Sequence, residues 1–94
     1  MSADALLLKM SDFMALPKPD VLRKGLYSLM EKEIRLAELE IANIRERYAV
    51  FSLSALYKAI EEGDVPEHPA WEDYIVWKNK KAQISHLQEL AESE

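Results

Sequence analysis

The two histidines are the residues of this chain that could begin a metal site. His68 lies in a predicted loop, and His86 stands three residues before Glu89 on a predicted helix. A His–Glu pair at that spacing can ligate zinc, but a zinc site needs further ligands, and no other residue is spaced to join them. The chain also has no cysteine, which excludes thiolate ligands and disulfides. We therefore expect no metal and no other cofactor.

Serines and paired carboxylates could serve in catalysis, but their positions favour structural roles. Ser52 and Ser54 stand at the predicted start of a helix, where a serine side chain caps backbone N–H groups. A serine nucleophile instead needs a base within hydrogen-bond reach. Glu61–Glu62 and Glu72–Asp73 are neighbours in sequence, and adjacent residues on a helix do not face each other. The two glycines are isolated, so there is no glycine-rich phosphate loop. We expect a protein that is not an enzyme.

The segment 61–74 combines acidic and aromatic residues and contains no lysine or arginine. Acidic groups steer a basic partner, and exposed aromatic side chains supply contact energy. We therefore predict a protein-binding surface at Glu67, Trp71, Asp73 and Tyr74. The alternative is a solvated loop whose aromatic residues turn into the core. The net charge of −5 suits a basic protein partner and makes nucleic acid an improbable one, because phosphate binding needs a basic face.

A long helix, predicted over residues 20–50, is the element that must organise the rest. Nothing inside it breaks a helix, and its apolar residues recur with the 4-3 spacing that keeps one stripe facing a partner helix. We call this stripe the seam; it consists of Tyr27, Met30, Ile34, Ala37, Ile41, Ile44 and Tyr48, and Phe51 continues it. A second, leucine stripe lies about a quarter-turn or more around the helix: Leu22, Leu26, Leu29 and Leu36.

Two different partners could cover the seam. The last helix, predicted over 69–91, has a weaker apolar stripe, with Lys81 and Gln88 where apolar residues are wanted. We therefore expect a second copy of the chain to fill the seam and the protein to be a homodimer. If the last helix covers the seam instead, the partner-binding site should be sought on the leucine stripe, Leu22–Leu36.

The remaining elements complete a single all-α domain over residues 1–94. A short helix is predicted over 52–63 and ends at Gly63, and it bridges the long central helix to the C-terminal helix, which packs on it antiparallel in a coiled-coil-like manner. Residues 1–19 form an N-terminal arm with a stiff extended joint at Pro17–Pro19. The first 16 residues fit one helical face or an extended arm; we favour the arm, with Leu6, Leu8 and Phe13 contacting a partner.

Localisation follows from the longest apolar run near the start. Ala5–Leu8 is too short for the core of a signal peptide or for a membrane span. We therefore expect a soluble, cytoplasmic protein that does not enter a membrane.

Several short motifs carry a resemblance to known proteins. They are Ser11-Asp12-Phe13 with Leu16-Pro17 before the long helix, Arg47-Tyr48 at its end, Leu56-Tyr57, Glu62-Gly63, and Trp71-Glu72-Asp73-Tyr74 with Trp77. In these the chain resembles a group of small helical prokaryotic proteins, some of which are regarded as antitoxins encoded beside a small toxin. Such proteins often have a glycine directly after the tyrosine that closes the long helix. Here Ala49 stands in that place, which would let the helix continue into Val50.

The resemblance implies an antitoxin-like protein that binds and neutralises a toxin and has no active-site residue. Two alternatives belong to other classes. One is a self-assembling structural helical protein, and the other is a weakly DNA-binding autoregulator, which would need dimerisation to gather its basic residues onto one face.

Overall fold

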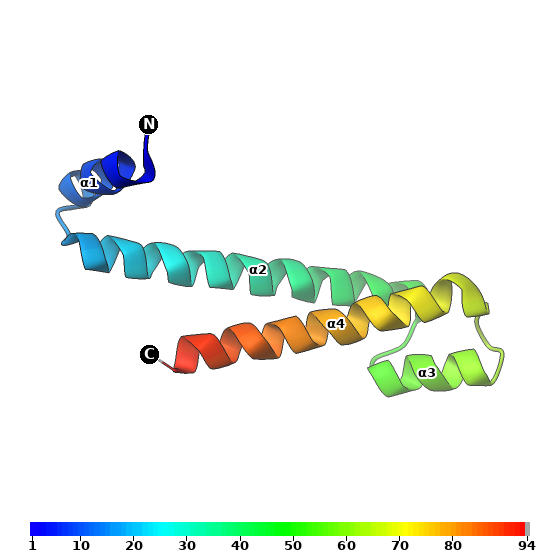
Figure 1. The fold of residues 1–94 in the computed structure, drawn as a ribbon. Helices are drawn as coiled ribbons and strands as arrows, with labels where there is room; N and C mark the ends of the chain where they lie inside the picture. Colours follow the sequence, from blue (N-terminus) through cyan, green and yellow to red (C-terminus); the bar gives the residue numbers. More distant parts are fainter. Residues whose placement is uncertain (94) are drawn as a thin grey trace. The chain divides into compact units, whose positions relative to one another are not determined.

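The fold is all-α, as the apolar spacing predicted. The structure is a computed structural model that describes residues 1–93. These residues form four helices and no strand: α1 (Ala3–Met14), α2 (Lys18–Tyr48), α3 (Leu53–Glu61) and α4 (Glu67–Glu92) (Figure 1). They divide into two compact units, residues 1–32 and the residues from 33 onward, where we expected one domain. The physical reason is that every buried side chain among the described residues belongs to the second unit.

The N-terminal segment is a helix, so the extended arm that we favoured is wrong. Ser2 caps α1, because its Oγ accepts a hydrogen bond from the Ala5 N–H at 3.1 Å. After Met14 the chain turns at Ala15, which has φ of +54°, and the Leu16 N–H bonds back to the Ser11 carbonyl at 3.1 Å. A good cap and a run of alanine, leucine and methionine, all strong helix formers, explain why the helical alternative prevails.

The proline joint is shorter than predicted, because helix α2 already begins at Lys18. The Pro17 carbonyl accepts from the N–H groups of Asp20 and Val21, at 3.0 and 3.1 Å, and so closes the first helical turn. Pro19 lies inside that turn, where its missing N–H has no intrahelical partner to lose. Asp20 is the acidic residue of the first turn, which is the end of the helix dipole that favours negative charge.

Helix α2 ends at Tyr48 and does not continue into Val50. Ala49 adopts φ of +53°, in the left-handed region. The Ala49 N–H bonds to the Glu46 carbonyl at 3.3 Å and the Val50 N–H to the Arg45 carbonyl at 3.1 Å, which together form a Schellman motif. The expectation that an alanine here would let the helix continue is therefore wrong; the two terminal hydrogen bonds outweigh the strain of a left-handed alanine.

The second unit contains the rest of α2 together with α3 and α4. Helix α3 is capped by Ser52, whose Oγ accepts from the Ala55 N–H at 3.1 Å, and the chain leaves it through Gly63 at φ of +76°. Helix α4 has non-helical dihedral angles at His68 and Pro69, so its regular part follows Pro69.

Within this unit α4 runs antiparallel to the second part of α2 (Figure 1). Two ion pairs show the direction: Arg47 meets Asp73, and seven residues earlier on α2, Glu40 meets Lys80. The long helix thus packs antiparallel on the C-terminal helix, as predicted.

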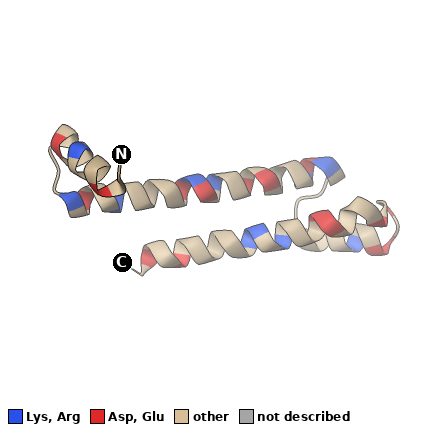
Figure 2. Cartoon of the chain, turned by 45° about the horizontal axis from the view of Figure 1, so that its top comes forward, with Lys and Arg blue, Asp and Glu red and all other residues tan. Residues whose placement is uncertain are grey.

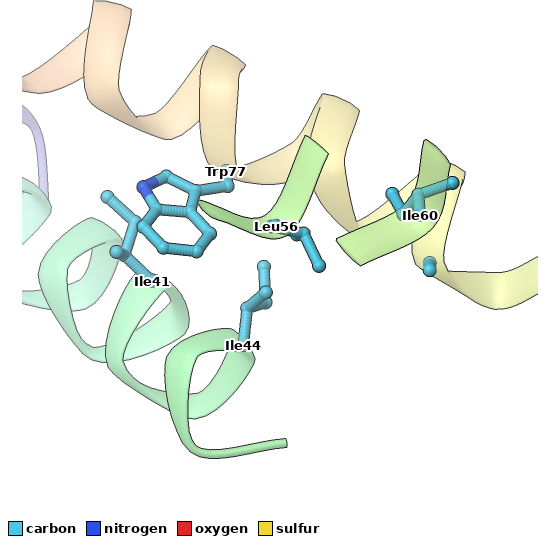
Figure 3. Close-up of a cluster of buried hydrophobic side chains, with 6 residues drawn as sticks. Ile41, Ile44, Leu56, Ile60 and Trp77 are labelled. Atoms are coloured by element: carbon cyan, nitrogen blue, oxygen red, sulfur yellow. The ribbon is translucent and has the colours of Figure 1, made fainter. Parts of the chain in front are cut away.

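The hydrophobic core lies where α2, α3 and α4 meet. Figure 3 shows Trp77 of α4 beside Ile41 and Ile44 of α2, with Leu56 and Ile60 contributed by α3. Leu56 is completely buried. Among the described residues no buried polar side chain lacks a hydrogen-bond partner. The core is therefore small, apolar and complete within the second unit.

Candidate interaction surfaces

The seam on α2 is covered within the chain over its second half. Ala37, Ile41 and Ile44 are buried, and the two isoleucines belong to the core with Leu56 and Trp77. A homodimer cannot use these side chains while the core is intact. The sequence argument compared the seam only with the weak stripe of the last helix, whereas α3 supplies much of the covering. The other predicted seam residues, Tyr27, Met30, Ile34 and Tyr48, are half-buried.

Asp73 is held by two partners at the end of α2. Its Oδ2 accepts hydrogen bonds from Arg47 Nη1 at 2.6 Å and from the Tyr48 hydroxyl at 2.5 Å. The Asp73 side chain is only 17% exposed, whereas that of Arg47 is 51% exposed. Asp73 was predicted as a contact for a basic partner, but in the structure its carboxylate forms an ion pair with Arg47 that joins α4 to α2.

The protonation of this cluster follows from the same contacts. Burial raises the pKa of Tyr48, and its hydrogen bond to Asp73 raises that pKa further. For Asp73, burial acts to raise the pKa, but the hydrogen bonds from Tyr48 and Arg47 outweigh it and leave the pKa below its usual value. The hydrogen bond to Asp73 raises the pKa of Arg47. The cluster is therefore an ionised carboxylate held by a guanidinium and a neutral phenol.

The aromatic residues of the acidic segment pack on one another. Tyr57 of α3 lies edge-on to Trp71 with ring centroids 5.5 Å apart, and Tyr74 lies 5.7 Å from each of them. Trp71 and Tyr74 are half-buried against the core, and Glu67 is exposed. The alternative in which the aromatic residues turn inwards is thus partly realised, and partner binding at Glu67, Trp71 and Tyr74 stays a prediction.

The histidine nearest these carboxylates has one acidic partner. His68 Nδ1 and Glu72 Oε1 are 2.8 Å apart on the surface, and this hydrogen bond lowers the pKa of Glu72. Over residues 1–93 no three histidine, aspartate or glutamate side chains gather in a way that could hold a metal ion. His86 is exposed.

Helix α1 exposes apolar side chains that sequence analysis assigned to a partner. Phe13 is 86% exposed, and Leu6 and Leu8 are about half exposed. No residue of the first unit is buried. These three predicted contact residues are therefore available to another molecule.

Two further exposed residues were not predicted as surface contacts. Leu39 extends the leucine stripe of α2, and its spacing of three from Leu36 could have revealed it. Phe51 is 92% exposed because the left-handed turn at Ala49 ends the periodicity that seemed to place it on the seam.

Comparison with known proteins identifies the family of the chain. The model of the Uncharacterized protein MJ0235 family matches residues 1–93. The chain belongs to this family. No curated protein and no solved structure matches the chain.

The family model matches both compact units, so the matched region includes the exposed helix α1 as well as the core of the second unit. No described helix of this MJ0235-family chain is both long enough and apolar enough to cross a membrane.

Proposed function

We propose that this MJ0235-family chain is a non-enzymatic protein–protein interaction module that binds its partner through α1. The exposure of α1 carries the proposal: Leu6, Met10 and Phe13 recur at i, i+4 and i+7, and all three are exposed. This is the spacing with which an amphipathic helix inserts anchors into a hydrophobic groove of another protein. Leu8 lies elsewhere around the helix and would contact the rim of that groove.

The charge distribution supports a basic partner. Residues 33–94 contain thirteen acidic and seven basic residues, whereas residues 1–32 contain four acidic and five basic ones. The red acidic residues around the turn between α3 and α4 in Figure 2 belong to this excess. An acidic unit attracts a basic protein over a distance of about 10 Å at moderate salt and raises the rate of encounter.

The finer form of the proposal is an antitoxin that neutralises a basic toxin. It is supported by the resemblance of the Phe13, Tyr48 and Trp71 motifs to those of small antitoxin-like proteins, and by the acidic balance of the chain. In this form the toxin would be encoded by the adjacent gene, and α1 would occupy an apolar groove on it.

Co-expression with the product of the adjacent gene tests the proposal. We expect that product to slow growth when it is expressed alone, and the full chain to relieve the effect and to co-purify with it. Phe13→Asp should weaken binding about tenfold or more, because it places a charge in the groove. Phe51→Asp is the matched control, since Phe51 is equally exposed but lies outside α1, and it should bind like the wild type.

Three outcomes decide between the parts of the proposal. Equal affinity of the wild type and both variants would exclude α1 as the binding element. Relief of growth without a complex would exclude direct neutralisation. Failure of the adjacent product to bind the wild-type chain would exclude the antitoxin form.

A further inference from the structure

An open hollow lies between α2 and α4 in the second unit, at the point where α3 begins. Its volume is about 440 Å³, within the roughly 300–1,000 Å³ of protein sites that hold a ligand. Apolar side chains from all three helices line it: Ile41, Leu53, Trp77 and Ile84. Figure 3 shows the indole of Trp77 beside Ile41. An apolar side chain of another molecule therefore finds apolar contacts here.

Two basic side chains line the same hollow, one from each of its two long helices. Arg45 stands one turn after Ile41 on α2, and its guanidinium lies 5.5 Å from the centre of the Trp77 ring. Lys81 stands one turn after Trp77 on α4, at a position of the apolar stripe of that helix. Both basic side chains are exposed. The lysine that interrupts the apolar stripe thus lies at the edge of a hollow and not within the core.

The hollow is positively charged although the unit around it is acidic. Neither Arg45 nor Lys81 has a carboxylate partner among residues 1–93, whereas three other basic residues of this unit do: Arg47, Lys58 and Lys80. Glu38 is the one acidic residue among the described residues that line the hollow, so its lining has one positive charge in excess. Residues 33–94 together contain thirteen acidic and seven basic residues. The charge of the hollow therefore favours a ligand that carries carboxylates.

We propose that this hollow binds an acidic segment of another protein. An apolar side chain of the segment enters between α2 and α4 and packs on Trp77, and the carboxylates beside it meet Arg45 of α2 and Lys81 of α4. Phe51, which also lines the hollow and is 92% exposed, packs on the same segment. The site uses no residue of α1 and takes an acidic ligand, so it stands independently of the proposed function, whose partner is basic.

Titration of the full nitrogen-15-labelled chain with three synthetic peptides, followed by NMR, tests the proposal. The first peptide, acetyl-Glu-Glu-Leu-Phe-Glu-Glu-amide, has an apolar centre between acidic residues. In the second, glutamine replaces every glutamate, and in the third, serine replaces leucine and phenylalanine. We expect the first peptide to shift the indole N–H signal of Trp77, with a dissociation constant below about 1 mM, and to leave that of Trp71 unchanged. The second should bind about fivefold more weakly or less, because its charge pairs are lost, and the third should cause no shift.

Charge variants of the chain locate the peptide. Lys81→Glu should raise the dissociation constant of the first peptide about tenfold or more, because it sets a carboxylate beside those of the ligand. Lys78→Glu is the matched control: Lys78 is exposed on the same helix but does not line the hollow, so this variant should stay within about twofold of the wild type. Arg45→Gln is a second variant of the hollow, and Arg35→Gln, elsewhere on α2, is its control. Circular dichroism should show unchanged helix content for all four variants.

Four outcomes would each overturn the proposal. They are an unmoved Trp77 signal at about 1 mM of the first peptide, equal affinity for the first and second peptides, equal affinity for the first and third peptides, and a loss of affinity in Lys78→Glu as large as in Lys81→Glu. None of these outcomes bears on binding through α1, so a failure here is distinguishable from a failure of the proposed function.

Discussion

Replacing Ala49 by glycine should stabilise the protein. An alanine held at φ of +53° is strained by its Cβ, and left-handed geometry costs an L-residue roughly 1–2 kcal/mol. Glycine adopts this geometry without strain, but it loses about 0.5–1 kcal/mol more backbone entropy on folding. The net expectation for Ala49→Gly is a gain of about 0.5–1 kcal/mol. Because Tyr48 and Val50 on either side pack against the core, the gain should appear in unfolding of the second unit.

Ala42→Gly is the matched control for this prediction. Ala42 is exposed in the regular part of α2, where glycine costs about 1 kcal/mol relative to alanine. Both variants make the same change in the unfolded chain, so the difference between them reports only the folded backbone at the two positions. We expect the two variants to differ by about 1.5–2 kcal/mol, with opposite signs relative to the wild type.

Urea unfolding followed by circular dichroism measures the difference. The slope of the free energy of unfolding against urea should be the same for the three proteins, so that the shift in midpoint reports stability alone. In thermal unfolding, 1 kcal/mol corresponds to about 4–8 °C for a domain of this size. If Ala49→Gly destabilises the protein as much as Ala42→Gly does, Ala49 does not end the helix in left-handed geometry, and the account of the terminus is wrong.

Two further predictions concern the core and its polar edge. Leu56→Ala should cost about 2–5 kcal/mol, since Leu56 is fully buried, whereas the exposed Ile75→Ala should stay within about 0.5 kcal/mol of the wild type in the same urea assay. The lowered pKa of Asp73 means that its stabilising contribution is present above its ordinary pKa of 3.8 and is lost as the pH falls through the lower folded value. Asp73→Asn should therefore lower the free energy of unfolding by about 1–2 kcal/mol at pH 7. It should also reduce the loss of stability between pH 7 and pH 2, as measured by urea unfolding at each pH. If the variant loses as much stability on acidification as the wild type does, the Asp73 carboxylate does not have this role.

The positions of the elements could be predicted because local signals are strong in this chain. Ser52 caps the start of α3, and Gly63 follows its end with a positive φ, as helix capping predicts. The 4-3 spacing indicates the buried face of α2. The start and the end of α2 were less predictable. A proline fits the first turn of a helix as well as an extended joint, and an alanine in left-handed geometry has no sequence signature.

The candidate surfaces, too, could be predicted from the sequence only in part. The exposure of Phe13 and of the leucine stripe follows a pattern visible in the sequence, because leucines spaced along a second helix face must meet something or face water. The sequence does not reveal that the Asp73 carboxylate is largely buried, since its partners Arg47 and Tyr48 lie 26 and 25 residues away.

Periodicity and helix capping act over a few residues, so the all-α class, the long helix and its two apolar faces can be predicted without the structure. Which of the two faces is buried depends on how the helices pack together. Both faces of α2 are apolar enough to pack, and the choice depends on where α3 brings Leu56 and Ile60 and where α4 brings Trp77. Their packing on Ile41 and Ile44 covers the second half of the seam and leaves Leu36 and Leu39 exposed, since burial is settled by contacts between residues far apart in the chain.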